Sequence, residues 1–159
     1  TNNNSDFSIS GSQLIMPNTT TLGTYNVDLI TSDGQRQLRK RVIVNVIPTV
    51  TGVTSTTSDG SYKQGDVIAI TVGFSEVVNV TGIPQLTLET GSSDAVVNYS
   101  SGSGSSILTF NYTVASGHSS ADLDYVATSS LALNSGTIKN AALNAATLTL
   151  ASPGATNSL

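Results

Sequence analysis

The chain lacks cysteine and tryptophan altogether and has a single histidine and a single methionine among its 159 residues. Small secreted animal domains are often held by disulfides, so the absence of cysteine favours a bacterial surface protein over an animal receptor. It also removes a cysteine nucleophile, and no Gly-x-Ser-x-Gly motif supplies a serine in its place. Aromatic residues make up only 5% of the chain, which leaves few rings on which a sugar could stack. We therefore expect no enzymatic activity.

Charged residues are also scarce, at 10% of the chain against roughly 25% in an average domain. Thr, Ser and Asn together supply 59 residues, so the surface is rich in hydroxyls and amides, which suits an extracellular β protein. The net charge of −4 argues against nucleic acid as a partner. No apolar run approaches the roughly 18 residues of a membrane span, so no membrane insertion is expected. No signal peptide is recognisable, so export to the cell surface would make this chain a processed or excised piece.

Period-2 alternation of apolar residues is the main structural signal in the chain. From Val67 to Glu76, β-branched and aromatic residues alternate with small or polar ones, as in a half-buried strand. Leu108 to Val114 repeats the pattern, and we expect these two strands to pack across from each other. Further short strands, one of them at 145–150, recur about every 8–12 residues. The predicted fold class is all-β, an immunoglobulin-like antiparallel β-sandwich preceded by a small partial β-sheet module, with a closed barrel as the alternative.

The predicted partial module covers residues 1–47. Its motifs are F-S-I-S-G-x-x-L at 7–14, G-T-Y-N-V at 23–27, an Asp-Gly turn at 33–34 and V-I-V-N-V at 42–46. This series resembles the C-terminal half of a bacterial cadherin-like domain. Because the first strands of such a domain are missing, one apolar face of the sheet would be uncovered. We expect the following domain or another copy of the chain to cover that face.

The predicted sandwich covers residues 48–159. Its motifs are G-S-Y-K-Q-G-D-V-I-A-I-T-V-G-F-S-E at 60–76, V-T-G-I-P-Q-L-T-L-E-T-G at 80–91, Y-S-S-G-S-G-S-S-I-L-T-F-N-Y-T-V at 99–114 and S-A-D-L-D-Y at 120–125. Over residues 52–159 the chain is similar to a bacterial immunoglobulin-like repeat of large surface adhesin and fibre proteins. The resemblance implies a sandwich repeated in tandem and does not imply an enzyme. The chain departs from the family at Asn140, where the family tends to have an Asp followed by Gly-Asn.

Asp122 and Asp124 are the most site-like residues of the chain. Two carboxylates separated by one residue point the same way in an extended segment, and such hard oxygen ligands suit Ca²⁺. Asp59, Asp66 and Glu76 in neighbouring loops would supply the further charge of a calcium site. The alternative is that the aspartates cap turns by accepting backbone N–H bonds, because no Asp-x-Asp-x-Asn-Gly loop is present. No other cofactor is expected.

A basic tract holds four of the six positive charges of the chain. Its members are Arg36, Arg39, Lys40 and Arg41. As a patch they would bind an anionic ligand such as an acidic polysaccharide, lipopolysaccharide or an anionic lipid headgroup. The alternative, which we favour, is that these charges protect an edge strand from pairing with another chain.

These patterns and resemblances favour a structural and adhesive role, as a stalk or spacer of a bacterial surface or fibre protein. The expected partners are neighbouring domains of the same protein or neighbouring copies of the chain, together with a glycan or other cell-surface ligand. One alternative is a subunit of a self-assembling extracellular filament completed by strand addition. Another is a carbohydrate-binding module that contacts a glycan through loops such as 91–95, 100–106 and 117–124.

Overall fold

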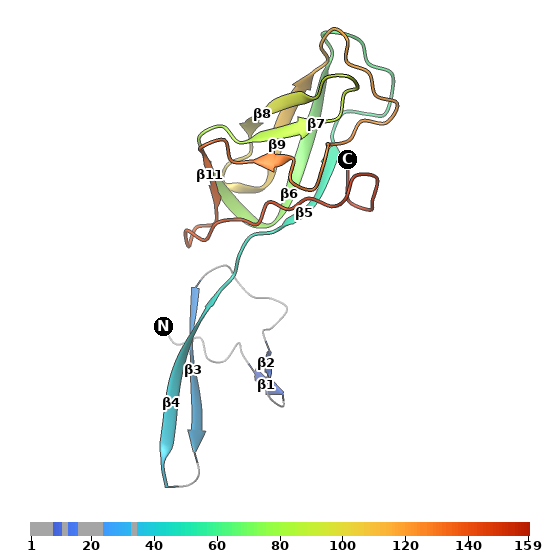
Figure 1. Cartoon of the computed structure of the whole chain (residues 1–159). Helices are drawn as coiled ribbons and strands as arrows, with labels where there is room; N and C mark the ends of the chain where they lie inside the picture. Colours follow the sequence, from blue (N-terminus) through green and yellow to red (C-terminus); the bar gives the residue numbers. More distant parts are fainter. Residues whose placement is uncertain (1–7, 11–12, 16–23, 33–34) are drawn as a thin grey trace. The chain divides into compact units, whose positions relative to one another are not determined.

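A computed structural model of the chain describes residues 8–10, 13–15, 24–32 and 35–159. The chain divides into two compact units, unit 1 (Thr1–Val46) and unit 2 (Ile47–Leu159). The described residues form strands, turns and loops but no helix (Figure 1), so the predicted all-β class is confirmed. Accordingly, the described part of the chain offers no long apolar helix that could cross a membrane.

Unit 1 contributes two small antiparallel sheets. In the first, β1 (Ser8–Ser10) pairs with β2 (Gln13–Ile15). In the second, β3 (Thr24–Ser32) pairs along its whole length with β4 (Gln37–Asn45). The predicted Asp-Gly turn between these two strands lies outside the described residues. The cadherin-like origin of the unit stays a prediction.

The β3–β4 pair has one mainly apolar face. Val27 lies opposite Val42 in the register, and Leu29 lies opposite Lys40. Residues directly opposite each other in an antiparallel pair share a face, so the valines and Leu29 line one side. Val27 is 3% exposed, while Leu29 and Val42 are half-buried. The apolar face of the sheet is therefore present, and what covers it stays a prediction.

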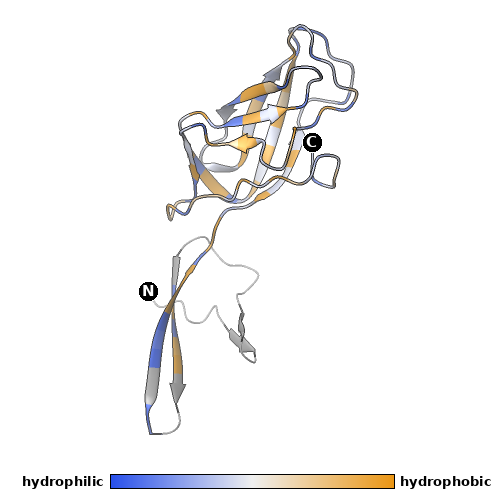
Figure 2. Ribbon diagram, viewed as in Figure 1, coloured by the Kyte–Doolittle hydropathy of each residue, from blue (hydrophilic) through white to orange (hydrophobic). Residues whose placement is uncertain are grey.

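Unit 2 contains seven strands whose pairings join them into one antiparallel sheet. The order is β10-β7-β8-β9-β6-β11, and β5 pairs with β6 as well. The strands are β5 (Val50–Ser55), β6 (Val67–Thr81), β7 (Gln85–Leu88), β8 (Ala95–Ser101), β9 (Ser105–Thr113), β10 (Leu131–Ala132) and β11 (Thr137–Lys139). The sheet curls strongly (Figure 1), and apolar residues follow its strands (Figure 2).

The strand β6 is the centre of unit 2. Its first half pairs with β5 on one side and with β9 on the other, and its last residues pair with β11. The sequence predicts a strand from Val67 to Glu76 that Val77, Val78 and Val80 continue as far as the break at Gly82, and β6 accordingly runs to Thr81. The prediction that β6 and the 108–114 strand pack across from each other is wrong. They are hydrogen-bonded neighbours, with Ile70 opposite Phe110.

One apolar core fills the inside of the curled sheet. The largest fully buried side chains include Tyr125, Phe110, Ile70, Leu86 and Leu88. They come from the neighbouring strands β6 and β9, from β7, which β8 separates from β9 in the sheet order, and from the segment before β10. Burial of each such side chain stabilises the fold by about 1.5–3 kcal/mol, so this core holds the curl together.

The prediction of a strand at 145–150 is wrong, because this segment does not pair continuously with another strand. Ala145 and Thr147 each make one isolated bridge, to Lys139 and to Thr49 respectively. Leu150 is nevertheless buried in the core, at 4% exposed. The apolar alternation that predicts a strand here therefore reports side-chain packing rather than strand pairing.

Candidate functional site

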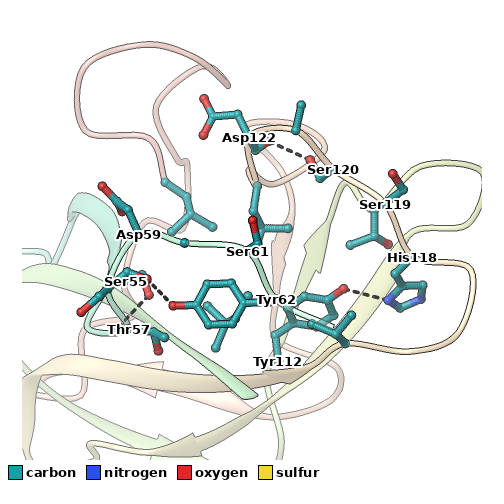
Figure 3. Close-up of a pocket in the computed structure, with 18 of the residues that line it drawn as sticks. Ser55, Thr57, Asp59, Ser61, Tyr62, Tyr112, His118, Ser119, Ser120 and Asp122 are labelled. Carbon is teal, nitrogen blue, oxygen red and sulfur yellow. Dashed lines mark hydrogen bonds between the residues drawn. The ribbon is translucent and has the colours of Figure 1, made fainter. Parts of the chain in front are cut away.

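A groove of about 710 Å³ opens in unit 2 where β5 ends and β6 begins. The loop between these strands forms one side, and the segment after β9 forms the other (Figure 3). The chemically distinctive lining residues are Asp59, Tyr62, Tyr112, His118 and Asp122. We call this hollow the polar groove.

The β5–β6 loop is held by hydrogen bonds between side chains and backbone. The Thr57 N–H donates to Ser55 Oγ over 3.0 Å, and the Ala69 N–H donates to Thr57 Oγ1 over 2.8 Å. Further along, the Lys63 N–H donates to Asp66 Oδ2 over 2.9 Å. Asp66 thus caps the turn that leads into β6, as the turn-capping alternative expects.

Tyr112 and His118 form a bonded pair at one end of the polar groove (Figure 3). Tyr112 Oη lies 2.8 Å from His118 Nδ1, and the Ala115 N–H also donates to Nδ1 over 3.4 Å. Because a backbone N–H can only donate, Nδ1 is the acceptor, the neutral ring carries its proton on Nε2, and Tyr112 donates. Burial raises the pKa of Tyr112, so its hydroxyl stays protonated at neutral pH.

Asp59, Asp122 and Tyr62 are the exposed members of the polar groove. No described residue hydrogen-bonds either carboxylate, whereas the Tyr62 hydroxyl donates to the Ser58 carbonyl. The Tyr62 side chain is 37% exposed, and its ring lies in the middle of the groove in the view of Figure 3. The lining of the groove therefore includes two carboxylates that no described residue hydrogen-bonds and one accessible aromatic ring.

The five carboxylates predicted as calcium ligands are not gathered in one place. Asp59 and Asp122 line the polar groove, but Glu76 is buried and accepts a 3.1 Å bond from Asn140 Nδ2. Asp124 caps backbone N–H groups outside the groove. Within the described ranges, no three His, Asp or Glu side chains are placed to hold a metal ion together. Calcium binding stays a prediction without a defined ligand set.

Asp124 accepts two backbone bonds, one from its own turn and one from the C-terminal segment. Its Oδ1 accepts from the Tyr125 N–H and its Oδ2 from the Gly154 N–H, each over 2.8 Å. We expect Asp124→Ala to lower the free energy of unfolding by about 1–2 kcal/mol, because both donors lose their partner. Urea denaturation measures the loss, with Asp94→Ala as the control because Asp94 is exposed and bonded to no described residue.

The same variant separates capping from calcium binding. A capping role predicts that a chelator leaves the melting temperature of the unmodified chain unchanged. If the chelator lowers that melting temperature and Asp124→Ala no longer responds to it, then Asp124 is a calcium ligand and the capping assignment is wrong.

The predicted anionic-ligand tract lies in unit 1 and is divided between the two faces of its hairpin. Arg39 and Arg41 lie opposite Ile30 and Asp28, whereas Lys40 falls on the other face of β4. Arg41 Nε donates to Asp28 Oδ1 over 2.9 Å, and this bond holds the pKa of Asp28 below its usual range. One charge of the tract is thus neutralised locally.

Arg36 precedes β4, and Arg36, Arg39 and Lys40 are all exposed. The strand β4 is an outer strand of its described two-stranded sheet, which is the setting in which basic side chains protect an edge. Anionic-ligand binding by the tract stays a prediction.

Residue patterns alone did not identify Tyr62, Tyr112, His118 or Asn140 as site residues. Tyr62 is an aromatic residue in a Ser-, Gly- and Asp-rich loop, and that contrast was the one available signal. Tyr112 falls on the core side of a strand pattern, and the loop around His118 offers no motif. Their pairing depends on where β9 and the following loop meet, which a local pattern does not encode.

Comparison of the chain with known protein families, with characterised proteins and with solved structures found no match in any of the three. The resemblances drawn from its motifs therefore stay predictions, and its function is argued from geometry.

Proposed function

We propose that unit 2 is a load-bearing, non-enzymatic spacer domain of an extracellular bacterial surface or fibre protein. The observation that carries the proposal is the course of the chain at the two ends of the unit. The first strand and the last segment run parallel, side by side, and are hydrogen-bonded at both ends of their contact. We further propose that the curled sheet is a variant of the immunoglobulin-like sandwich, since its distant strands share one core.

Two backbone hydrogen bonds define this parallel contact. The Thr147 N–H donates to the Pro48 carbonyl over 2.8 Å, next to a parallel bridge between Thr49 and Thr147. Further along both segments, the Val53 N–H donates to the Asn157 carbonyl over 3.0 Å. Because residue numbers rise in the same direction on both sides, the C-terminal segment follows β5 from its beginning to its end.

The two ends of the unit consequently lie at opposite ends of β5. Ile47 directly precedes the first bond, whereas Leu159 lines the polar groove together with Thr54 and Ser55. A strand of six residues spans roughly 20 Å. A force applied through residues 47 and 159 therefore runs along β5 and loads the bonds on both sides of this strand simultaneously.

Side chains fasten the C-terminal segment between its two bonds to β5. The buried Tyr125 donates through its hydroxyl to the Ala151 carbonyl over 2.8 Å, and Asp124 accepts from Gly154 as described above. The C-terminal segment is thus fixed to the core although it forms no continuous strand pairing. This attachment supports the proposal that the segment transmits load and does not detach first.

Single-molecule pulling in two directions tests this proposal. The chain contains no cysteine, so attachment points are introduced as Ile47→Cys with Leu159→Cys, or as Ile47→Cys with Ala142→Cys in the exposed turn after β11. We expect a higher unfolding force for the first pair at the same loading rate, because it shears β5 along its length. The second pair leaves residues 145–159 outside the load path.

A bond-specific variant sharpens the test. Thr147→Pro removes the N–H that donates to Pro48, whereas Thr149→Pro alters an exposed residue of the same segment whose N–H bonds to no described group. We expect only Thr147→Pro to lower the force of the 47–159 pair. Equal forces in both pulling directions, or equal effects of the two prolines, would contradict a load-bearing role for the parallel contact.

A filament subunit completed by strand addition is the second candidate. One observation favours it: in the described residues the β3–β4 sheet has two strands, so each strand has an outer edge that pairs with no described strand. Such edges accept a further strand through backbone hydrogen bonds. Assembly of the purified chain into fibres would favour this candidate over the spacer.

A further inference from the structure

We propose that the polar groove of unit 2 binds a neutral oligosaccharide. The proposal is independent of the load-bearing role, because it concerns the loops around the groove and not the parallel contact along β5. It rests on three properties of the groove: its size, the charge of its lining and the unpaired polar groups that it presents.

The size of the groove fits a small ligand. Its volume of about 710 Å³ falls within the range of about 300–1,000 Å³ that is typical of ligand sites. Part of its lining is apolar, as at Ile68 and Val114, while serine and threonine hydroxyls from both loops share the rest. A ligand that has both hydroxyls and C–H faces matches this mixture.

The charge of the lining excludes an anionic ligand. Asp59 and Asp122 are the acidic residues of the lining, and no Lys or Arg occurs among the described residues that line the groove. An acidic polysaccharide, phosphate or lipid headgroup would therefore meet repulsion without a compensating cation. A sugar hydroxyl, in contrast, donates readily to a carboxylate, and bonds to a charged acceptor are the stronger ones.

The unpaired carboxylates are the feature that points to a ligand. Asp66, Glu76, Glu89 and Asp124 all accept hydrogen bonds within unit 2. Asp59 and Asp122 accept none from the described residues, although both come from hydrogen-bonded loops that line one groove. The exposed Asp94 is also unpaired, but it lies outside the groove and serves as the control below.

The aromatic and imidazole groups complete the recognition surface. Tyr62 exposes part of its ring to the groove, and aromatic faces pack against the C–H faces of sugars. His118 accepts at Nδ1 from Tyr112, which leaves its Nε2–H as a donor with no described partner. The groove thus offers carboxylate acceptors, an imidazole donor and a stacking face within one hollow.

Binding of short neutral oligosaccharides to the whole chain tests the proposal. The probes are oligomers of glucose, mannose, galactose and N-acetylglucosamine, followed by isothermal titration calorimetry and by ligand-observed NMR. We expect saturable binding of at least one probe. Tyr62→Ala, and separately the double change Asp59→Asn with Asp122→Asn, should weaken that binding about tenfold or more.

Matched variants keep this test specific. Asp94→Asn changes a carboxylate outside the groove, so it should leave the affinity within about twofold of the unmodified chain. Tyr62→Phe retains the ring, so it should lose less affinity than Tyr62→Ala. Circular dichroism and melting curves check that every variant is folded, which the exposure of Tyr62 leads us to expect. Unchanged affinity in Tyr62→Ala and in the double Asp variant would overturn the proposal.

Three further outcomes also overturn it. They are the absence of binding to every neutral probe, binding of acidic oligosaccharides only, and salt-sensitive binding of a lysine-rich peptide only. A calcium titration on the same samples shows whether Asp59 and Asp122 hold a cation instead. None of these results bears on the pulling experiment, so failure of the saccharide site and failure of the spacer role are distinguishable.

Discussion

Replacement of Asn140 by alanine should lower the free energy of unfolding by about 3 kcal/mol. Asn140 is 1% exposed, and its Nδ2 donates to Glu76 Oε2 over 3.1 Å. Its Oδ1 accepts from the Asn144 N–H over 3.0 Å. Alanine would leave a carboxylate that is only 7% exposed without this donor and would also leave a small cavity, so both effects destabilise the fold.

Urea denaturation followed by tyrosine fluorescence measures this loss, because four of the five tyrosines lie in unit 2. Asn111→Ala is the matched control, since Asn111 is exposed and its side chain hydrogen-bonds to no described residue. We expect the control to change stability by no more than about 0.5 kcal/mol. A loss of similar size in both variants would show that the Glu76–Asn140 bond does not stabilise the fold.

Asn140→Asp extends the same prediction to charge. It places a second carboxylate against Glu76, and two carboxylates this close do not both ionise, so one folded-state pKa rises. A group whose folded pKa is raised favours the folded state at low pH. The stability deficit of Asn140→Asp relative to the unmodified chain should therefore be smallest near pH 4, about the unfolded value, and grow toward neutrality.

Gly102→Ala should lower the free energy of unfolding by about 3 kcal/mol or more. Gly102 has φ of +109°, which an L-residue rarely adopts, and strain of this kind costs about 1–3 kcal/mol. A Cβ there would overlap the Ile107 carbonyl oxygen and would lie 3.0 Å from the Leu108 Cα. Both are backbone atoms of β9, so the hairpin between β8 and β9 would have to move.

Gly104→Ala provides the matched control two residues away. Gly104 also has positive φ, at +84°, but a Cβ there would meet no atom within 4 Å. We expect a loss of about 1 kcal/mol, from backbone strain alone. If both variants lose the same free energy in urea denaturation, close contact with β9 is not what requires glycine at residue 102.

This hairpin also shows where composition misleads. The Ser- and Gly-rich stretch 100–106 predicts a flexible loop. In the structure the Ser103 N–H donates to Tyr99 Oη and the Gly104 N–H donates to the Val78 carbonyl, each over 2.8 Å. The loop is thus bonded both to its own hairpin and to β6. Glycine at residue 102 permits the close approach of the loop backbone to β9.

Period-2 alternation predicts most of the strands, because successive side chains of a strand point to opposite faces and every second residue is therefore buried. In β6 the alternation holds past Glu76, so Phe74, Glu76 and Val78 all point inward and Val77 points outward. A charged residue at an inward position would destabilise the fold if nothing paired with it. Here Asn140, 64 residues away, supplies the partner.

The amino-acid sequence by itself therefore determined the all-β class and the inward and outward faces of the long strands, since both depend on residues that are neighbours in the chain. Only the tertiary structure decided that β6 and β9 pair within one curled sheet and that the C-terminal segment follows β5 in parallel. Only the tertiary structure decided the polar groove as well, because its two loops meet only after the strands that carry them have paired. Such contacts depend on which segments, far apart in the chain, meet. Bringing them together costs conformational entropy, and only burial of the shared core offsets that cost.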